Sequence, residues 1–186
     1  MDFPESKPSL LIEAEGVKVV VGRVEADVFE SELRRVKMPS GGDWRDVVRA
    51  YVHALREAVK KLGDLALSVH LPGSHGLGAL NPVESVLQAL VDAGLDVEDA
   101  GRALTFITEM AYAAGRDALR SAENPVHPEV PAVATALKSA AAQDFPILRQ
   151  VVAAKAGGAP DEGQFEFSLE LVIAGLEAVV ARTAPR

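Results

Sequence analysis

Apolar residues recur every three or four positions along most of this chain, which is the spacing of one face of an α-helix. In the segment 44–62 that face consists of Val47, Val48, Tyr51, Leu55, Val59 and Leu62. In the segment 162–182 it consists of Phe165, Leu169, Val172, Ile173, Leu176 and Val180. Both segments are therefore predicted to be amphipathic helices with one buried side.

Capping residues mark the ends of several helices. Asp43 and Asp96 stand directly before periodic apolar runs, where a short polar side chain can accept a hydrogen bond from a free backbone N–H. Gly63 and Gly94 stand directly after such runs, as glycine does at a helix C-terminus. These signals predict helices at 44–62 and 97–122 and an end for the helix before Gly94.

Proline and glycine divide the remainder of the chain. The stretch 71–82 is rich in both residues and is predicted to be a loop, in which Asn81 caps a helix that starts at Pro82 and runs to Ala93. Further breaks leave room for shorter helices, predicted at 64–70, 132–142 and 145–155.

Residues 6–36 carry two conflicting patterns. The run VKVVV at 17–21 is rich in β-branched residues, which favour extended chain, and Gly16 and Gly22 each cost a helix about 1 kcal/mol relative to alanine. A helical stripe nevertheless continues through the segment, formed by Leu10, Ala14, Val17, Val21, Val24 and Val28. We predict one long helix, with a β-hairpin as the alternative. The chain then holds about eight helices, and the predicted fold class is all-α.

Composition agrees with a helical domain outside a membrane. The 186 residues are 48% hydrophobic but only 5% aromatic, which favours helices packed through aliphatic side chains. Since there is no cysteine, disulfides and thiolate metal sites are excluded. No apolar run approaches the ~20 residues that span a bilayer, and the N-terminus lacks the pattern of a signal peptide. We expect a soluble, cytoplasmic protein without a membrane partner.

The charge distribution argues against direct DNA binding by these residues. The net charge is −8, whereas phosphate recognition needs clustered lysine and arginine. The densest basic cluster, Arg34, Arg35 and Lys37, has Glu30 and Glu32 beside it. A solvated helix end is the simplest interpretation of that cluster.

No residue pattern predicts an enzyme, a metal site or a bound cofactor. The four histidines do not form the HExxH spacing. His70 and His75 share one loop, where loop polarity explains them better than metal ligation. The glycines at 73–78 match neither a phosphate-binding loop nor a nucleophile elbow. Glu109 lies in an apolar helical stretch and is a candidate polar anchor in a ligand cavity, with an exposed position as the alternative.

Three stretches together resemble the TetR family of bacterial transcriptional regulators. The sequence FEFSLEL at 165–171, followed by GLE at 175–177, is similar to the F-E-F-G-L-x-L-x-x-x-G-L-E signature of that family's last helix, with Ser168 in place of glycine. Residues 78–100 are similar to the G-x-N…L…L…G-L-S-x-E-x-A passage of the sensor domain, and GGDWR at 41–45 resembles the common G-x-D-W-R motif. The resemblance spans nearly the whole chain.

The N-terminus departs from that family. FPESK at 3–7, followed by Leu10 and Leu11, is similar to the phrase F-P-x-x-K-x-x-L-L that lies just after the family's DNA-reading helix. The resemblance implies that residues 1–5 are a remnant following a missing helix-turn-helix, that 6–36 is the connecting helix, and that 6–186 is a ligand-binding and dimerisation domain. DNA would be a partner only if the helix-turn-helix were restored.

The resemblance also implies a function and two sites. A small apolar or amphipathic effector would bind a cavity among the helices and relieve DNA binding by a repressor. The expected ligand-binding residues are Tyr51, His53, Leu67, His70, Phe106, Glu109 and Met110. The expected homodimer interface consists of Ala111, Ala114, Gly115, Ala118, Phe167, Leu171, Ala174 and Ala178. One alternative is a helical binding protein that modulates a full-length repressor by heterodimerising with it; a helical enzyme is another.

Overall fold

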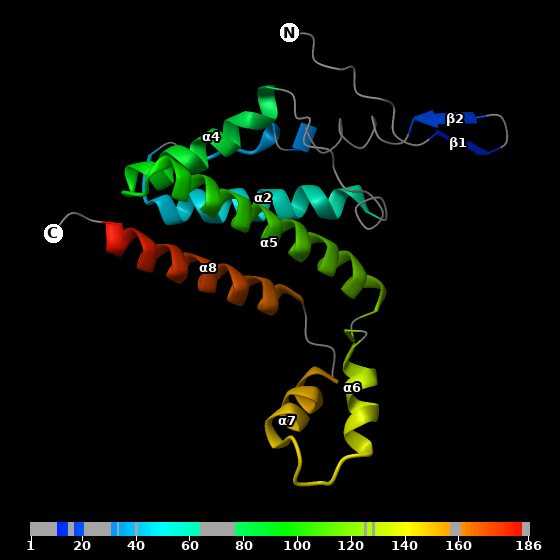
Figure 1. The fold of residues 1–186 in the computed structure, drawn as a ribbon. Coiled ribbons are helices and arrows are strands. Elements are labelled where there is room, and N and C mark those ends of the chain that lie inside the picture. The colour runs from blue at the N-terminus through cyan, green and yellow to red at the C-terminus, as the bar shows by residue number, and fades with distance from the viewer. Residues whose placement is uncertain are drawn as a thin grey trace.

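The computed structural model describes residues 11–14, 17–20, 31–32, 34–39, 41–63, 77–124, 126–127, 129–156 and 161–183. A two-stranded antiparallel hairpin, β1 (Leu11–Ala14) and β2 (Val17–Val20), precedes the helices. The helices are α2 (Trp44–Leu62), α4 (Leu77–Asp92), α5 (Val97–Glu123), α6 (Glu129–Lys138), α7 (Pro146–Lys155) and α8 (Asp161–Thr183) (Figure 1).

Helix α2 lies at the centre of the body. It contacts α4, α5 and α8, and α5 also contacts α4 and α8. Helices α6 and α7 contact each other and extend away from this body in a separate helical arm (Figure 1). The predicted all-α fold class is confirmed for the domain body, with fewer described helices than the eight expected. Among the described helices, none is both long enough and apolar enough to cross a bilayer.

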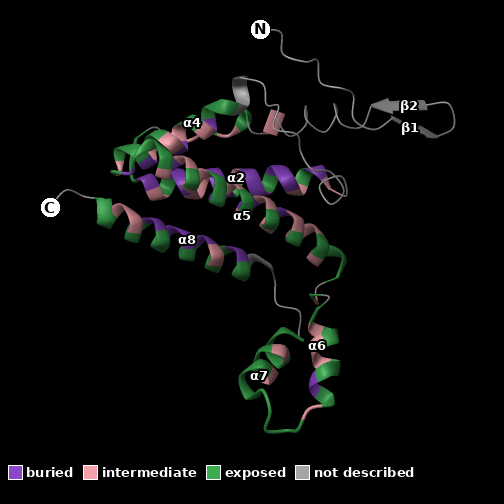
Figure 2. Ribbon diagram, in the orientation of Figure 1, coloured by how far each residue is buried: buried purple, intermediate pink, exposed green. Residues whose placement is uncertain are grey.

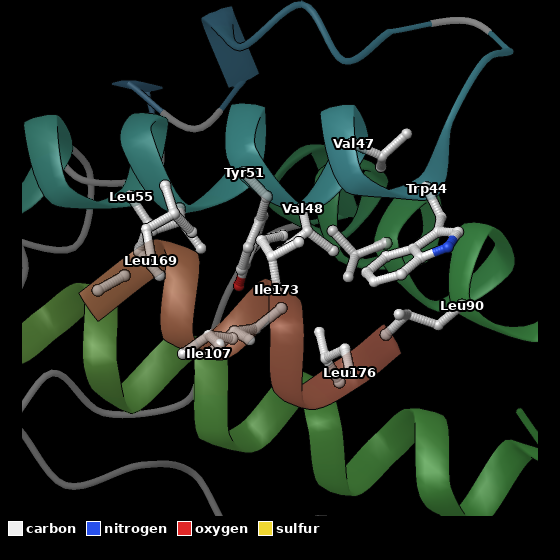
Figure 3. Packing of buried hydrophobic residues seen from close by; sticks show 14 of the residues in the cluster. Trp44, Val47, Val48, Tyr51, Leu55, Leu90, Ile107, Leu169, Ile173 and Leu176 are labelled. Atoms are coloured by element: carbon white, nitrogen blue, oxygen red, sulfur yellow. The ribbon is translucent and has the colours of Figure 1, made fainter. Parts of the chain in front are cut away.

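The core forms where the predicted apolar stripes of α2 and α8 meet. Figure 3 shows Leu169, Ile173 and Leu176 of α8 pointing toward α2. Ile107 of α5 and Leu90 of α4 complete the same cluster, and both are fully buried. In contrast, burial on the α6–α7 arm is nearly absent among the described residues (Figure 2). Four helices therefore share one hydrophobic core, and the arm stands outside it.

The caps predicted for α2 and α5 are confirmed. Asp43 caps α2 by accepting a hydrogen bond from the Arg45 backbone N–H at 2.9 Å, and Asp96 caps α5 through the Asp99 N–H at 2.8 Å. Gly63 follows α2 with a φ of 57°, a left-handed conformation that favours glycine. These local signals fix the ends of both helices independently of the rest of the fold.

The long helix predicted for 6–36 is wrong at residues 11–20. There the backbone forms the alternative hairpin, in which Leu11 pairs with Val20 and Ala14 pairs with Val17. The β-branched valines of β2 favour extended chain, and that local preference prevails over the helical stripe. Residues 31–32 and 34–35 are helical. The rest of the predicted connecting helix, and the remnant at 1–5, lie outside the described residues.

Three other predicted boundaries change. Helix α4 begins at Leu77, so Asn81 is not its cap and Pro82 lies in its second turn. Leucine and alanine at 77–80 favour helix, which extends α4 backward through part of the predicted loop. Helix α6 likewise starts at Glu129, whose carboxylate suits a helix N-terminus, and ends at Lys138. The short helix predicted at 64–70 lies outside the described residues.

The Asp43 cap predicts a pH effect on stability. The Arg45 backbone N–H, and then its guanidinium, lower the pKa of Asp43 in the folded chain. A lowered folded pKa contributes stability that is present above the unfolded pKa of about 3.9 and is lost as pH falls through the folded value. In Asp43→Asn the amide oxygen still caps the helix but does not titrate.

We therefore expect Asp43→Asn to be less stable than the parent near neutral pH, because the uncharged amide bonds Arg45 less strongly, and to approach the stability of the parent as pH falls. Urea unfolding at a series of pH values measures this difference. Identical slopes of unfolding free energy against pH below about 4 would contradict the assignment.

Candidate functional site

A cleft opens between the start of α2 and the middle of α4. Its volume is ≈ 700 Å³, within the range of small-molecule sites. Gly41 and Gly42, both with positive φ, turn the chain at its edge. Its walls include both apolar and polar side chains and are formed by Pro39, Asp43, Trp44, Val47, Glu84, Ser85, Gln88, Ala89, Asp92 and Ala93.

The cleft walls carry negative charge. The charged residues that line it are Asp43, Glu84 and Asp92, and no lysine or arginine is among its described lining residues. Asp92 accepts a hydrogen bond from Gln88 Nε2 at 2.7 Å. The lowered pKa of Asp43 keeps that carboxyl ionised at neutral pH. An uncharged or cationic molecule with an apolar part suits such walls better than an anion does.

Arg45 connects this cleft to α8. Its guanidinium lies 4.7 Å from the centroid of the Trp44 indole and bonds the Asp43 carboxylate at 2.9 Å. On its other side, Arg45 Nε donates to Glu177 Oε1 at 2.5 Å. The Glu177 and Asp43 hydrogen bonds raise the pKa of Arg45. One side chain therefore contacts two residues of the cleft wall and the last helix.

A small polar centre lies between α2 and α5. The Tyr51 hydroxyl is 3.1 Å from the hydroxyl of the half-buried Thr108, at the edge of the apolar core. Figure 3 shows the Tyr51 ring reaching from α2 among Ile107, Leu169 and Ile173. Burial raises the pKa of Tyr51, and burial together with the neighbouring Tyr51 raises that of Tyr112.

These shifts predict how the two tyrosines ionise. A raised folded pKa contributes stability that is present below the unfolded pKa of about 10 and is lost as pH rises through the folded value. We expect both tyrosines, the only two in the sequence, to ionise together with loss of helix. Ultraviolet absorbance and circular dichroism, recorded on one alkaline titration, test this. Tyrosinate forming near pH 10 while the helices remain intact would contradict it.

The structure does not gather the predicted ligand residues around one cavity. Tyr51 is buried, and Met110 packs at the edge of the core. His53 instead contacts α8, with its ring 5.0 Å from that of Phe165. Phe106, which is 59% exposed, and Glu109 lie on the outside of α5.

The structure therefore does not bring His53, Phe106 and Glu109 together around one cavity, and their role in ligand binding stays a prediction. Helical spacing does not show which neighbouring helix a given face contacts. The exposed position of Glu109 agrees with the alternative that the sequence allows. Leu67 and His70 lie outside the described residues.

Sequence reasoning missed several residues that the structure brings together. Trp44 and Arg45 were noticed only as part of the GGDWR motif, and Thr108 and Tyr112 were not singled out. Thr108 and Tyr112, four positions apart on one helix, are the sequence signal of polar groups on a partly buried helix face. In the described parts of the chain, no three histidine or acidic side chains are grouped as metal ligands.

The outer face of α8 carries apolar side chains that are largely exposed among the described residues. Phe167 is 61% exposed and Leu171 is 59% exposed, and Ala174 and Ala178 continue the same stripe. Their spacing of four, three and four residues is that of a helix-packing seam. We call these four residues the α8 outer stripe.

The predicted interface residues on α5 divide into two groups. Ala111 is fully buried, and Gly115 lies so close to α2 that an added Cβ would be 2.6 Å from Val59 Cβ. Both residues therefore pack inside the single chain, where the small size of Gly115 permits the close crossing of α2 and α5, and their role at an interface stays an untested prediction. Ala114 and Ala118 are partly exposed. Small side chains alone could not distinguish contacts within a chain from contacts between chains.

Comparison with known proteins gives one family match and several similar structures. Residues 37–180 match the family model described as the tetracyclin repressor-like, C-terminal domain. The fold resembles that of ActR from Streptomyces coelicolor in complex with actinorhodin, with a TM-score of 0.68 and 24% identity over 86% of this chain and 77% of that chain. Apo ActR gives a TM-score of 0.66 at 24% identity, with the same shares of the two chains covered.

SCO7222, a TetR from the same organism, gives a TM-score of 0.61 and 20% identity over 86% of this chain and 75% of that chain. No curated protein matches the sequence. At these identities, the similar structures show the fold alone.

Proposed function

Since the chain belongs to the TetR family, whose tetracyclin repressor-like C-terminal domain it carries over residues 37–180, we propose that it is the effector-sensing and dimer-forming body of a transcriptional repressor. The observation that carries this proposal is the α8 outer stripe. A helix that is apolar on both sides is normally buried on both sides, and a second copy of the chain supplies the missing cover.

The homodimer proposal is supported by the arrangement of α8. Two copies related by a two-fold axis would bring the same stripe of each chain together, as an isologous interface requires. Phe167 and Leu171 provide the large side chains, while Ala174 and Ala178 permit close approach of the helices. Exposed residues of α5, including Phe106, are available to extend the contact.

The effector-binding proposal is supported by the cleft beside α2. Its size admits a small organic molecule, and Trp44 offers an aromatic wall next to polar groups. A small apolar or amphipathic effector is the class that fits these walls. The similar structure of ActR was solved with actinorhodin, so one relative of this fold holds a small molecule. The polar centre at Tyr51 and Thr108 is a second point at which an effector could hydrogen-bond if the core opens.

Relief of DNA binding then follows from a shift between two states. An effector changes the equilibrium only by the difference in its affinity for the two states, and allosteric coupling of this kind is typically about 1–3 kcal/mol. Binding beside α2 would move the start of that helix, which Arg45 connects to α8. Effector binding and the geometry of the dimer are thereby linked.

Native mass spectrometry of the chain, purified from cells under gentle conditions, tests the proposal. The expected result is a dimer that retains a small molecule or takes one up from a panel of aromatic compounds. A monomer that binds nothing would contradict it. A mixed species containing a longer regulator would instead support the heterodimerising alternative. Trp44→Ala is the variant expected to lose the small molecule while the subunit count stays the same.

A further inference from the structure

Helix α8 has two apolar faces, so hydrophobicity alone determines only weakly which of them packs against the core. The buried side consists of Phe165, Leu169, Val172, Ile173 and Leu176. The α8 outer stripe also contains a phenylalanine and a leucine. At about 100° per residue, the two apolar faces point in nearly opposite directions. A half-turn of α8 about its own axis would therefore exchange one apolar face for another.

Charge distinguishes the two flanks between these faces. Glu166, Glu170 and Glu177 fall on one flank, about a quarter-turn from either apolar face. The opposite flank carries the small uncharged residues Ser168 and Gly175. The rotation of α8 thus determines on which side its row of glutamates lies.

Helix α2 presents a matching basic row. Arg45, Arg49 and His53 are four residues apart and share one face. Each lies against one glutamate of α8: Arg45 Nε is 2.5 Å from Glu177 Oε1, Arg49 donates to Glu170, and His53 Nε2 is 3.5 Å from Glu166 Oε1. The order is antiparallel, as two helices running in opposite directions require.

We infer that this α2–α8 charge ladder is a positioning device, which fixes the rotation of α8 so that Phe167 and Leu171 face outward to meet the second copy. The inference rests on the dimer proposed above. In the half-turned packing the glutamates lie on the flank away from Arg45 and Arg49, and all three pairs are lost. Exposed ion pairs contribute little to overall stability, so the ladder acts mainly by selecting between two packings of similar hydrophobicity.

Charge reversal and charge exchange test the ladder. The first variant is Arg45→Glu with Arg49→Glu, and the second adds Glu170→Arg and Glu177→Arg, which restores opposite charges on the two helices. The control is Lys60→Glu with Arg120→Glu, because both residues pair with a carboxylate of their own helix. Sedimentation equilibrium gives the dimer dissociation constant of each protein.

A thiol probe reports the rotation of α8 directly. The sequence contains no cysteine, so Leu169→Cys or Phe167→Cys introduces a single reactive thiol on the inner or outer face. In the chain without charge changes, Phe167→Cys should react quickly in the monomer and Leu169→Cys slowly. In the reversed variant, we expect Leu169→Cys to react at least about tenfold faster, with the control unchanged.

We expect the reversed variant to weaken the dimer at least about tenfold and the exchanged variant to recover most of that loss. An unchanged dissociation constant after reversal would overturn the inference, as would an exchanged variant as weak as the reversed one. If the chain without changes is monomeric at all concentrations, the proposed dimer fails. The labelling rates of Leu169→Cys then decide separately whether the ladder sets the rotation of α8.

Discussion

Gly115→Ala should destabilise the folded chain by about 1–3 kcal/mol, although alanine normally favours a helix more than glycine does. The added Cβ would lie 2.6 Å from Val59 Cβ and 3.1 Å from the Arg56 carbonyl oxygen. Neither atom is at the tip of a flexible side chain, so α5 and α2 must move apart. That movement would loosen the contact between the two helices at the centre of the core.

Gly101→Ala is the matched control on the same helix. An added Cβ at Gly101 has no neighbouring atom within 4 Å, so only helix propensity changes. We expect a stabilisation of about 0.5–1 kcal/mol. Urea unfolding of both variants and the parent gives the comparison. If Gly115→Ala stabilised the chain as Gly101→Ala does, the close crossing of α2 and α5 would be wrong.

Phe167→Glu with Leu171→Glu should convert the dimer into a monomer that remains folded. Both side chains are largely exposed in the single chain, so the substitutions cost little inside it. In a dimer they would place carboxylates at the centre of an apolar contact. Interface residues of this kind typically contribute about 2 kcal/mol or more each, so the dissociation constant should rise at least about 100-fold.

Phe145→Glu with Ile147→Glu controls for the loss of exposed apolar surface. These residues are 58% and 68% exposed, but they belong to the α6–α7 arm and not to α8. We expect this control to keep the parent's dissociation constant. Circular dichroism verifies that all three proteins retain their helices. Equal weakening of the dimer by both pairs would show that the α8 outer stripe has no special role.

The sequence predicts the ends of helices best, because a capping interaction involves only residues that are close in the sequence. Asp43, Gly63 and Asp96 mark helix ends through hydrogen bonds and backbone conformations that involve only neighbouring residues. The apolar stripes of α2 and α8 also predict their buried faces correctly. The hairpin at 11–20 is not determined by the apolar spacing, because a helical stripe and a β-branched run occupy the same residues, and the structure follows the β-branched run.

The candidate sites depend on contacts between helices, which spacing does not reveal. Because Gly115 is small, it is compatible both with an interface between chains and with a close crossing of two helices in one chain. The position of Val59 opposite Gly115 shows that it permits a close crossing within the chain. The sequence predicts that His53 lines a ligand cavity, whereas in the structure His53 lies against Glu166 and Phe165 of α8. Phe167 and Leu171 were predicted at the interface, and their exposure on α8 leaves that prediction open to test.

Sedimentation equilibrium of the unmodified chain, over about 1–100 µM, tests the central claim most directly, because the fraction of dimer depends on protomer concentration. The account predicts a species of twice the 19.6 kDa chain mass, dissociating only toward the lowest concentrations. A mass of 19.6 kDa throughout would mean that α8 keeps an uncovered apolar face in solution, and it would contradict the account.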